Sequence, residues 1–223
     1  MRFLFRCFFL VVCVFLSSSC ASLGTRFPSK VDIQDAKQVI VVVPAGHKPF
    51  TAVLTAWSVE NGKWLRKFGP WSAVVGRSGL APAGEKREGD GRTPSGIYAM
   101  NASFGNAPSI KTKLMYRQAT VHDFWIDEPS SAEYNQWVSG DVPAVSHEKM
   151  LRTDGLYNIG AVIEYNTSPI VPGNGSAIFL HIWKEHGTKP TAGCVALSER
   201  RLRKLLTWLD ADKNPVILLD LRR

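Results

Sequence analysis

The stretch that decides the fold runs from Ile178 to Glu199 and reads IFLHIWKEHGTKPTAGCVALSE. Its apolar beginning predicts a buried strand, and His181 follows at the strand end, where a side chain is held rigidly. Cys194 comes after a Thr-Ala-Gly sequence and before a short apolar run that leads to a helix cap at Ser198. The stretch therefore predicts a strand, a turn and a helix, with a histidine and a thiol beside the turn.

A thiol next to an imidazole is a recurring nucleophilic pair. A free thiol has a pKa of about 8.5 and is mostly protonated at neutral pH. A nearby imidazole takes the proton or forms an ion pair, so the thiolate becomes the nucleophile. Gly193 permits close backbone approach and a positive φ, so backbone N–H groups at this turn could face a developing oxyanion. The sequence leaves open whether Cys194 meets a histidine in space.

Two other interpretations of the same residues stay open. His181, His186 and Cys194 could be three zinc ligands, although their spacing matches no common zinc motif and no second cysteine is available. Alternatively, Cys194 is a buried, inert thiol and His181 a hydrogen-bonded residue at a strand end. On count alone, a single cysteine in an exported chain fits a reactive thiol and a buried one equally well.

Most of the remaining chain is predicted to form strands. The dipeptide Asn61-Gly62 is the strongest short hairpin signal and predicts two short strands around it. Alternation predicts that the odd-numbered residues from Tyr157 to Ile163 share one face of a strand. The runs of β-branched and aromatic residues that predict strands lie within residues 37–46, 50–68, 71–80, 97–105, 157–166, 176–183 and 215–221.

Few helices are expected. A helix that starts after Ser198 carries one apolar stripe, made of Leu202, Leu205, Leu206 and Leu209. Residues 146–152 predict a short second helix, with Ser146 as its N-cap. Residues 81–96 predict a long surface loop, a kind of segment that is usually functional, and residues 112–138 predict irregular structure. The expected fold is a single mostly β domain of the α+β class with one or two helices.

Residues 1–20 have the layout of a secretory signal peptide. Arg2 and Arg6 precede an apolar run that is too short to span a bilayer. Cys20 follows three serines and resembles the lipobox cysteine of bacterial lipoproteins, which is acylated and becomes the new N-terminus. Ordinary cleavage after Ala21 is the alternative, so the sequence predicts export and leaves lipidation open.

The predicted organisation after the signal is simple. Residues 21–37 are polar and predict a tether, and residues 38–221 predict the folded domain. Cys7 and Cys13 leave with the signal, so Cys194 is the single cysteine of the folded part.

The chain is basic, with a formal net charge of +8 at pH 7. Without Arg2 and Arg6, 25 basic residues remain against 19 acidic ones, a net charge of +6. A basic exported protein could bind nucleic acid, an anionic membrane surface or an acidic wall polymer. The basic residues are scattered, with no zinc-finger spacing, RNP motif or basic arm, so we expect no nucleic-acid partner.

Taken together, the segments GSAIFLHI and PTAGCVAL resemble the catalytic core of the L,D-transpeptidase catalytic-domain family, the cysteine enzymes of bacterial peptidoglycan. That family has a histidine on a strand and a Ser/Thr-x-Gly-Cys sequence that closes the site. The resemblance extends upstream to EGDGRTPSGIY, WIDEPSSAEYNQWV and YNIGAVIEYN, and covers roughly residues 39–220. It implies the β-sandwich-like fold of an L,D-transpeptidase domain.

The resemblance implies a role for each residue of the motif. Cys194 is implied to be the nucleophile and His181 the general base. Gly193 is the motif glycine and Thr191 its hydroxyl residue, and together with Val195 they are implied to position the substrate or the oxyanion. The family needs neither a metal ion nor a cofactor, and none is expected.

Two departures fall next to the cysteine. Many members read Ser-His-Gly-Cys, followed by a hydrophobic residue and an arginine. Here Ala192 replaces that histidine, and Ala196 stands where the arginine would be. The arginine is thought to help hold the substrate or the oxyanion, so Cys194 would need another helper.

A third departure concerns the base. Many members have glycine after the catalytic histidine, whereas here Ile182 follows His181. The pair His186-Gly187 therefore competes for the role. The apolar strand that leads into His181 favours His181 over His186.

The reaction implied by the resemblance is a two-step acyl transfer. Cys194 would attack the carbonyl of an L,D peptide bond next to diaminopimelate in a stem peptide, and His181 would give a proton to the leaving amine. An amine of a second stem peptide would then give a crosslink. Water would instead give carboxypeptidase or amidase activity, and a non-catalytic wall-binding lipoprotein is the alternative from another class. Expected partners are peptidoglycan stem peptides in the periplasm or cell envelope, with membrane attachment through a lipid on Cys20 left open.

Overall fold

The structure is a computed structural model that describes residues 33 and 35–221. The predicted signal peptide, Cys20 and most of the predicted tether lie outside the described residues. In the described part, no helix is long and apolar enough to cross a membrane.

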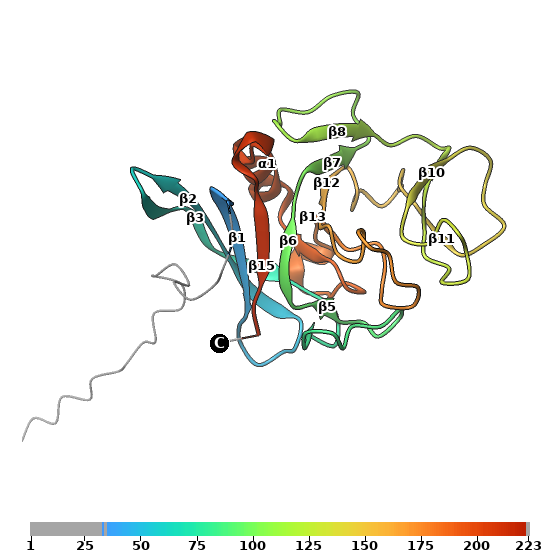
Figure 1. Cartoon of the computed structure of the whole chain (residues 1–223), viewed down its shortest axis with the longest axis horizontal. Coiled ribbons are helices and arrows are strands. Elements are labelled where there is room, and N and C mark those ends of the chain that lie inside the picture. The colour runs from blue at the N-terminus through green and yellow to red at the C-terminus, as the bar shows by residue number, and fades with distance from the viewer. Residues whose placement is uncertain (1–32, 34, 222–223) are drawn as a thin grey trace, which may run out of the picture.

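Ten strands of the described chain form one strongly curled sheet (Figure 1). Most neighbours are antiparallel, but three pairs are parallel: the first and last strands of the chain, β13 (Phe179–Ile182) with β14 (Val195–Leu197), and β7 (Ala102–Gly105) with β8 (Met115–Gln118). In spatial order the strands are β6 (Gly96–Ala99), β15 (Val216–Leu219), β1 (Gln38–Pro44), β2 (Thr51–Glu60), β3 (Lys63–Val74), β14 (Val195–Leu197), β13 (Phe179–Ile182), β12 (Ile159–Val162), β7 (Ala102–Gly105) and β8 (Met115–Gln118).

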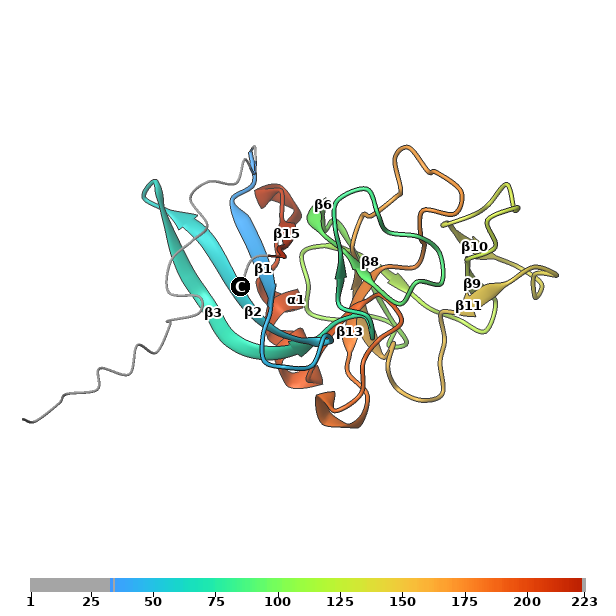
Figure 2. The same ribbon diagram turned by 90° about the horizontal axis from the view of Figure 1, so that it is seen from below.

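The predicted hairpin at Asn61-Gly62 is confirmed, and it is longer than expected. Asn61 and Gly62 both have positive φ, 51° and 73°, as a two-residue turn between right-twisted strands requires. The strands β2 and β3 have 10 and 12 residues, and β3 takes in residues 71–74, the start of the segment that the sequence predicts as a separate strand at 71–80. Figure 2 shows this long hairpin at one side of the molecule.

The helix α1 (Glu199–Trp208) packs against β12 and β13 and fills the curl of the sheet. The predicted leucine stripe is confirmed, because its four members are at most 1% exposed. Ser198 has the backbone conformation of an N-cap, but its side chain makes no capping hydrogen bond. Both halves of the sheet contribute to one core around α1, and the fold is the mostly β, α+β domain that the sequence predicts, with the sandwich-like arrangement that the resemblance implies.

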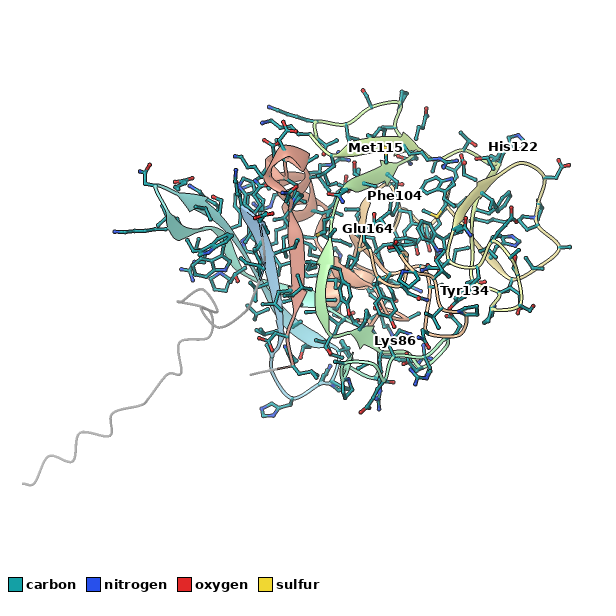
Figure 3. All side chains as sticks on the ribbon, in the orientation of Figure 1. Lys86, Phe104, Met115, His122, Tyr134 and Glu164 are labelled. Carbon is teal, nitrogen blue, oxygen red and sulfur yellow. The ribbon has the colours of Figure 1, made fainter. Side chains whose placement is uncertain are left out.

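A small lobe covers the other face of β12 and β13. Its three-stranded sheet consists of β9 (Asp123–Ile126) between β10 (Trp137–Ser139) and β11 (His147–Lys149). The ring of Trp125 lies 4.9 Å from that of Phe179, so the lobe and the main sheet share a second core. Among the side chains that Figure 3 labels, Phe104 of this second core and Tyr134 are buried, whereas Met115 and His122 are exposed at the surface.

The lobe corrects two predictions. Residues 146–152 form no helix, because His147 to Lys149 pair with β9 and the ring of His147 lies 4.9 Å from that of Phe124. Residues 112–138 are less irregular than predicted, since they contain β8, β9 and β10. All four residues of β9 are buried, so this strand lacks the polar and apolar alternation that identifies a half-exposed strand.

Three smaller corrections concern strand ends. Residues 97–105 form two strands, β6 and β7, which lie far apart in the sheet. Tyr157 precedes β12 and packs in the second core, so it does not share a face with Ile159. The predicted loop at 81–96 is confirmed apart from a short parallel pair, β4 (Leu80–Ala81) and β5 (Thr93–Pro94). Two 3₁₀ turns, η1 (Glu185–Gly187) and η2 (Ala211–Lys213), complete the helical structure of the described residues.

Candidate active site

The register of two strands places His181 and Cys194 on one face of the main sheet. In the parallel pair β13 and β14, His181 lies opposite Ala196. Cys194 is two residues before Ala196, and side chains two residues apart in a strand point to the same side. This side faces the second core, where the ring of His181 lies 5.3 Å from that of Tyr157 and Cys194 packs in the same cluster.

The thiol of Cys194 is buried and hydrogen-bonded to the strand beside it. The residue is 7% exposed. Its Sγ donates to the carbonyl oxygen of Ala177 at 3.2 Å and accepts the N–H of Phe179 at 3.3 Å. Burial raises the pKa of Cys194, and the nearby carboxylate of Glu148 raises it further. The resting thiol is therefore protonated.

The imidazole of His181 is fixed in one tautomer by a backbone contact. Its Nδ1 lies 2.7 Å from the carbonyl oxygen of Ile182. Because a carbonyl only accepts, we assign the proton to Nδ1, which leaves Nε2 with a free lone pair. Burial lowers the pKa of His181 to about 4, so the ring is neutral at physiological pH. The departure at Ile182 does not disturb this contact, since only the backbone of that residue takes part.

The turn before Cys194 is held by the hydroxyl of Thr191. This hydroxyl donates to the carbonyl oxygen of Cys194 at 2.6 Å and accepts the N–H of Gly193 at 3.2 Å. Gly193 does not have a positive φ, contrary to one use of glycine that the sequence suggests. Glycine suits this position because two backbone segments approach each other closely. A Cβ at position 193 would lie only 3.1 Å from the carbonyl oxygen of Arg92. The Val195 side chain is fully buried in the main core, so any role of Val195 in the site falls to its backbone.

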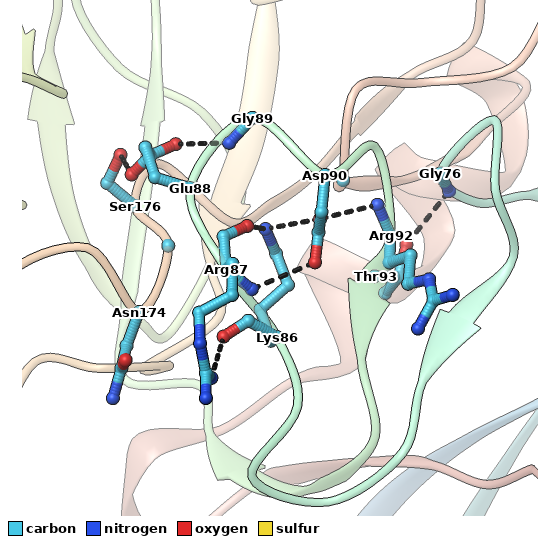
Figure 4. Close-up of polar contacts among 12 residues, drawn as sticks. Gly76, Lys86, Arg87, Glu88, Gly89, Asp90, Arg92, Thr93, Asn174 and Ser176 are labelled. Atoms are coloured by element: carbon cyan, nitrogen blue, oxygen red, sulfur yellow. Dashed lines mark hydrogen bonds and ion pairs between the residues drawn. The ribbon is translucent and has the colours of Figure 1, made fainter.

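The loop at 81–96 is hydrogen-bonded to this turn through Thr93, and Figure 4 shows the polar contacts that hold the loop itself. The hydroxyl of Thr93 donates to the carbonyl oxygen of Cys194 at 3.3 Å and accepts the N–H of Gly76 at 2.9 Å. Lys86 is 4% exposed and pairs with Asp90 at 2.8 Å. The buried ammonium of Lys86 acts to lower the pKa of Cys194, although less than burial raises it.

Glu88 ties the same loop to the strand that leads into the site. Its carboxylate accepts the hydroxyl of Ser176 at 2.8 Å and the hydroxyl of Tyr134. Ser176 directly precedes Ala177, and the carbonyl oxygen of Ala177 accepts the hydrogen bond from the Cys194 thiol. The loop is therefore hydrogen-bonded both to Cys194 itself, through Thr93, and to the segment that accepts the thiol hydrogen bond, through Glu88. The sequence predicts that this loop is functional, but it does not show which of its side chains are hydrogen-bonded to the site.

Sequence reasoning misses a second group, which lies on the lobe side of His181. The hydroxyl of Tyr157 donates to the carboxylate of Glu148. The guanidinium carbon of Arg152 lies 5.0 Å from the centroid of the Tyr157 ring. Burial raises the pKa of Glu148 above its ordinary value, and Arg152 acts to lower the pKa of Cys194.

These contacts bear on the absent motif arginine. Ala196 occupies its position and is fully buried between Val74 and His181. Two cations from other parts of the chain, Lys86 and Arg152, lie close enough to the thiol to affect its ionisation. Positive charge near Cys194 is therefore present, although it comes from the loop and the lobe.

His186 lies away from this arrangement. It is exposed in η1 and lines a pocket with Trp183 and with residues of the β2–β3 side, among them Thr51 and Ser72. Among residues 33 and 35–221, no three His, Cys, Asp or Glu side chains gather in a way that could hold a metal ion. The zinc interpretation of His181, His186 and Cys194 therefore has no ligand cluster to support it.

One family model matches most of the chain. Residues 37–218 match the family model described as YkuD, L,D-transpeptidase catalytic domain. No curated protein matches the chain. A solved structure that matches is the helical cell shape determining protein Pgp2 from Campylobacter jejuni, at 17% sequence identity and a TM-score of 0.46. The match covers 84% of this chain and 49% of Pgp2, so the chain spans about half the length of that protein. Because the family model covers most of the sequence, the chain belongs to the YkuD family of L,D-transpeptidase catalytic domains.

Proposed function

We propose that this protein is a peptidoglycan L,D-transpeptidase that transfers an acyl group between stem peptides through a thioester on Cys194. The observation that carries the proposal is the register of β13 and β14, which puts Cys194 and His181 on one face. The Nδ1 contact to Ile182 supports His181 as the base, because it leaves Nε2 as the proton acceptor.

The first step forms the thioester. Nε2 of His181 takes the proton of the Cys194 thiol while the sulfur attacks the carbonyl carbon of an L,D peptide bond. The C–N bond then breaks, and the leaving amine receives the same proton from the imidazolium. Because the resting thiol and imidazole are both neutral, proton transfer accompanies attack and does not precede it.

The second step releases the acyl group. An amine of a second stem peptide attacks the thioester, His181 takes its proton, and the sulfur leaves as the restored thiol. Thr191 and Gly193 position the backbone of the turn, whose N–H groups are the candidates to face the oxyanion. Water in place of the amine gives the carboxypeptidase or amidase reaction on the same residues.

The sequence supports a proposed place of action in the cell envelope. The signal-like segment 1–20 supports export to the periplasm or cell envelope, and acylation of Cys20 would attach the protein to a membrane. Peptidoglycan stem peptides are the substrate in that compartment.

Product analysis with purified muropeptides tests the proposal. We expect crosslinked dimers, identified by mass, that disappear in Cys194→Ala. Shortened monomers without dimers would replace the transferase with the hydrolase. No change in the muropeptides, with an intact fold, would favour the non-catalytic wall-binding protein.

A further inference from the structure

The β2–β3 hairpin extends beyond its contact with the rest of the main sheet. β14 pairs with β3 only through Ala196 and Val74, at the last residue of β3. Up to that residue, the outer edge of β3 has no strand partner within the described chain. Both views place this hairpin at one end of the molecule and the lobe of β9, β10 and β11 at the other (Figures 1 and 2). The hairpin tip therefore lies far from the lobe, which shares a core with Cys194.

An aromatic surface lies between this hairpin and α1. The rings of Phe68 and Trp71 are stacked with their centroids 5.2 Å apart, and the Trp208 ring of α1 lies 5.6 Å from that of Phe68. All three side chains are only partly buried, and the guanidinium carbon of Arg201 lies 5.7 Å from the Trp71 centroid. Nearer the tip, Leu65 is 44% exposed. Its partner in β2 is two residues from the partner of Phe68, so Leu65 and Phe68 share a face.

Cations accompany these apolar side chains. Lys63, Arg66 and Lys67 flank Leu65 in β3, and all three are exposed. Glu60 is the one acidic residue between positions 58 and 74, and it forms an ion pair with Lys67. The hairpin therefore combines apolar and positively charged side chains, a composition that favours the interface between an anionic bilayer and water.

The chain enters the sheet at the same end of the hairpin. The N–H of Val59 donates to the carbonyl oxygen of Lys37 at 3.0 Å, and Val59 pairs with Trp64 of β3. Lys37 is exposed, so it adds a further cation beside the hairpin tip. The predicted signal segment and Cys20 lie upstream of Lys37 in the sequence. Attachment of that segment to a membrane would therefore connect the membrane to the end of the domain that carries the hairpin tip.

We propose that the tip of the β2–β3 hairpin docks on an anionic membrane surface, with Trp64 and Leu65 at the bilayer interface and the neighbouring cations on acidic headgroups. Indole rings favour the boundary between headgroups and acyl chains, and basic side chains beside them are attracted to acidic lipids. An acidic wall polymer would attract the same cations but offers little to an exposed leucine. Docking through the tip leaves the lobe and the candidate active site facing away from the membrane. The proposal needs neither Cys194 nor a stem peptide, so it is independent of the proposed function.

Binding to lipid vesicles tests the proposal. The protein, exported with Cys20→Ser so that no lipid can be attached at that position, is sedimented with vesicles of phosphatidylcholine alone or mixed with phosphatidylglycerol. We expect it to bind the anionic vesicles about tenfold or more tightly than the neutral ones, and the difference to shrink as salt is added. Lys63→Gln combined with Lys67→Gln should weaken binding to anionic vesicles about tenfold, and Leu65→Ser about threefold to fivefold.

Matched variants away from the hairpin are the controls. Lys149→Gln combined with Lys189→Gln removes the same charge from exposed positions and, like the hairpin pair, includes one lysine from an ion pair. Val142→Ser shortens an apolar side chain that is 67% exposed in the lobe. Both controls should change vesicle binding less than about twofold, because they lie beyond the reach of the docked surface. Equal binding of neutral and anionic vesicles, no binding of either, or equal weakening by hairpin and control variants would overturn the proposal. Hairpin-dependent binding to isolated cell-wall sacculi in place of vesicles would overturn it in favour of a wall polymer.

Discussion

At the scale of single residues, the proposed nucleophile Cys194 and the proposed base His181 are both uncharged at neutral pH. His181 and Cys194 are both buried in a core lined by Tyr157 and Phe179, where a charge on either is costly. The carboxylate of Glu148 also raises the pKa of Cys194 and so disfavours the thiolate further. We expect such a thiol to react slowly with general reagents, and in the proposed mechanism it becomes nucleophilic when His181 takes its proton during attack.

A first prediction follows for the reactivity of the thiol. Removing the charge of Glu148 in Glu148→Gln lowers the pKa of Cys194, since the carboxylate acts to raise it. We expect alkylation by iodoacetamide at pH 8 to be about threefold to tenfold faster than in the unmodified protein. Lys149→Gln should alkylate at the unmodified rate, and an equal or slower rate in Glu148→Gln would contradict this electrostatic picture.

A second prediction concerns the turn. Thr191→Val removes the hydroxyl that joins Gly193 to the carbonyl of Cys194, so the turn loses its alignment while the fold survives. We expect a stability loss of about 1 kcal/mol and a larger loss of kcat. Thr191→Ser keeps the hydroxyl and should restore kcat. Equal rates in the valine and serine variants would show that the hydroxyl plays no part.

At the scale of elements, the lobe is organised by one carboxylate. Asp123 at the start of β9 is 4% exposed and accepts from Thr120, from the Trp137 indole at 2.8 Å, from Ser139 and from Arg117 at 2.9 Å. Burial alone would raise the pKa of Asp123, but these hydrogen bonds outweigh burial and hold it well below its usual range. The charged form therefore stabilises the lobe.

The corresponding prediction is a local, pH-dependent loss of structure. Asp123→Asn should destabilise the lobe by about 1–3 kcal/mol, seen as faster hydrogen exchange of β9 and β10 amides while the amides of β1 and β15 are unchanged. A carboxylate with a lowered folded pKa stabilises above the unfolded pKa of about 3.9, and its contribution falls as pH drops through the folded pKa. The difference between the two proteins should thus be full at pH 6 and shrink below about pH 4. A difference that is independent of pH would assign the effect to packing.

The same scale shows why some elements could be predicted and others could not. The leucine stripe of α1 and the Asn61-Gly62 turn are local signals with one structural solution each. By contrast, β11 lies in a segment with helix-compatible residues, and its strand state depends on pairing with β9, more than twenty residues earlier. Long-range pairing of this kind overrides local propensity.

The candidate site divides in the same way. The motif residues Thr191, Gly193 and Cys194 are neighbours in sequence, so the sequence could point to them. Lys86 and Arg152 come from a loop and a lobe that only the fold brings near the thiol. Ala196 stands where many family members have an arginine. The sequence therefore could not show that Lys86 and Arg152 supply positive charge near Cys194 instead.

At the scale of the whole molecule, stability depends on keeping His181 uncharged. The folded pKa of His181 is about 4, against an ordinary value of 6.5, because the ring is buried. The unfolded chain therefore binds more protons between pH 6.5 and 4, and folding is destabilised as pH falls through that window. Above pH 6.5 both states hold the neutral ring, and this effect disappears.

Urea unfolding as a function of pH tests this dependence. We expect the unfolding free energy to fall by about 3 kcal/mol from pH 7 to pH 4 because of His181, an amount that corresponds to the shift in its pKa. His181→Gln, which cannot be protonated, should lack that part of the decline. A variant with the same acid sensitivity as the unmodified protein would show that other groups cause it.

The whole molecule also gives the central claim its most direct test. The protein is mixed with a stem tetrapeptide, quenched in acid within milliseconds to seconds, and its intact mass is measured beside Cys194→Ala and His181→Gln. The account predicts an added mass equal to the tripeptide acyl group on the unmodified protein, none on Cys194→Ala, and greatly delayed formation on His181→Gln. An adduct that persists in Cys194→Ala, or no adduct in a folded protein whose thiol remains free, would contradict a thioester on Cys194.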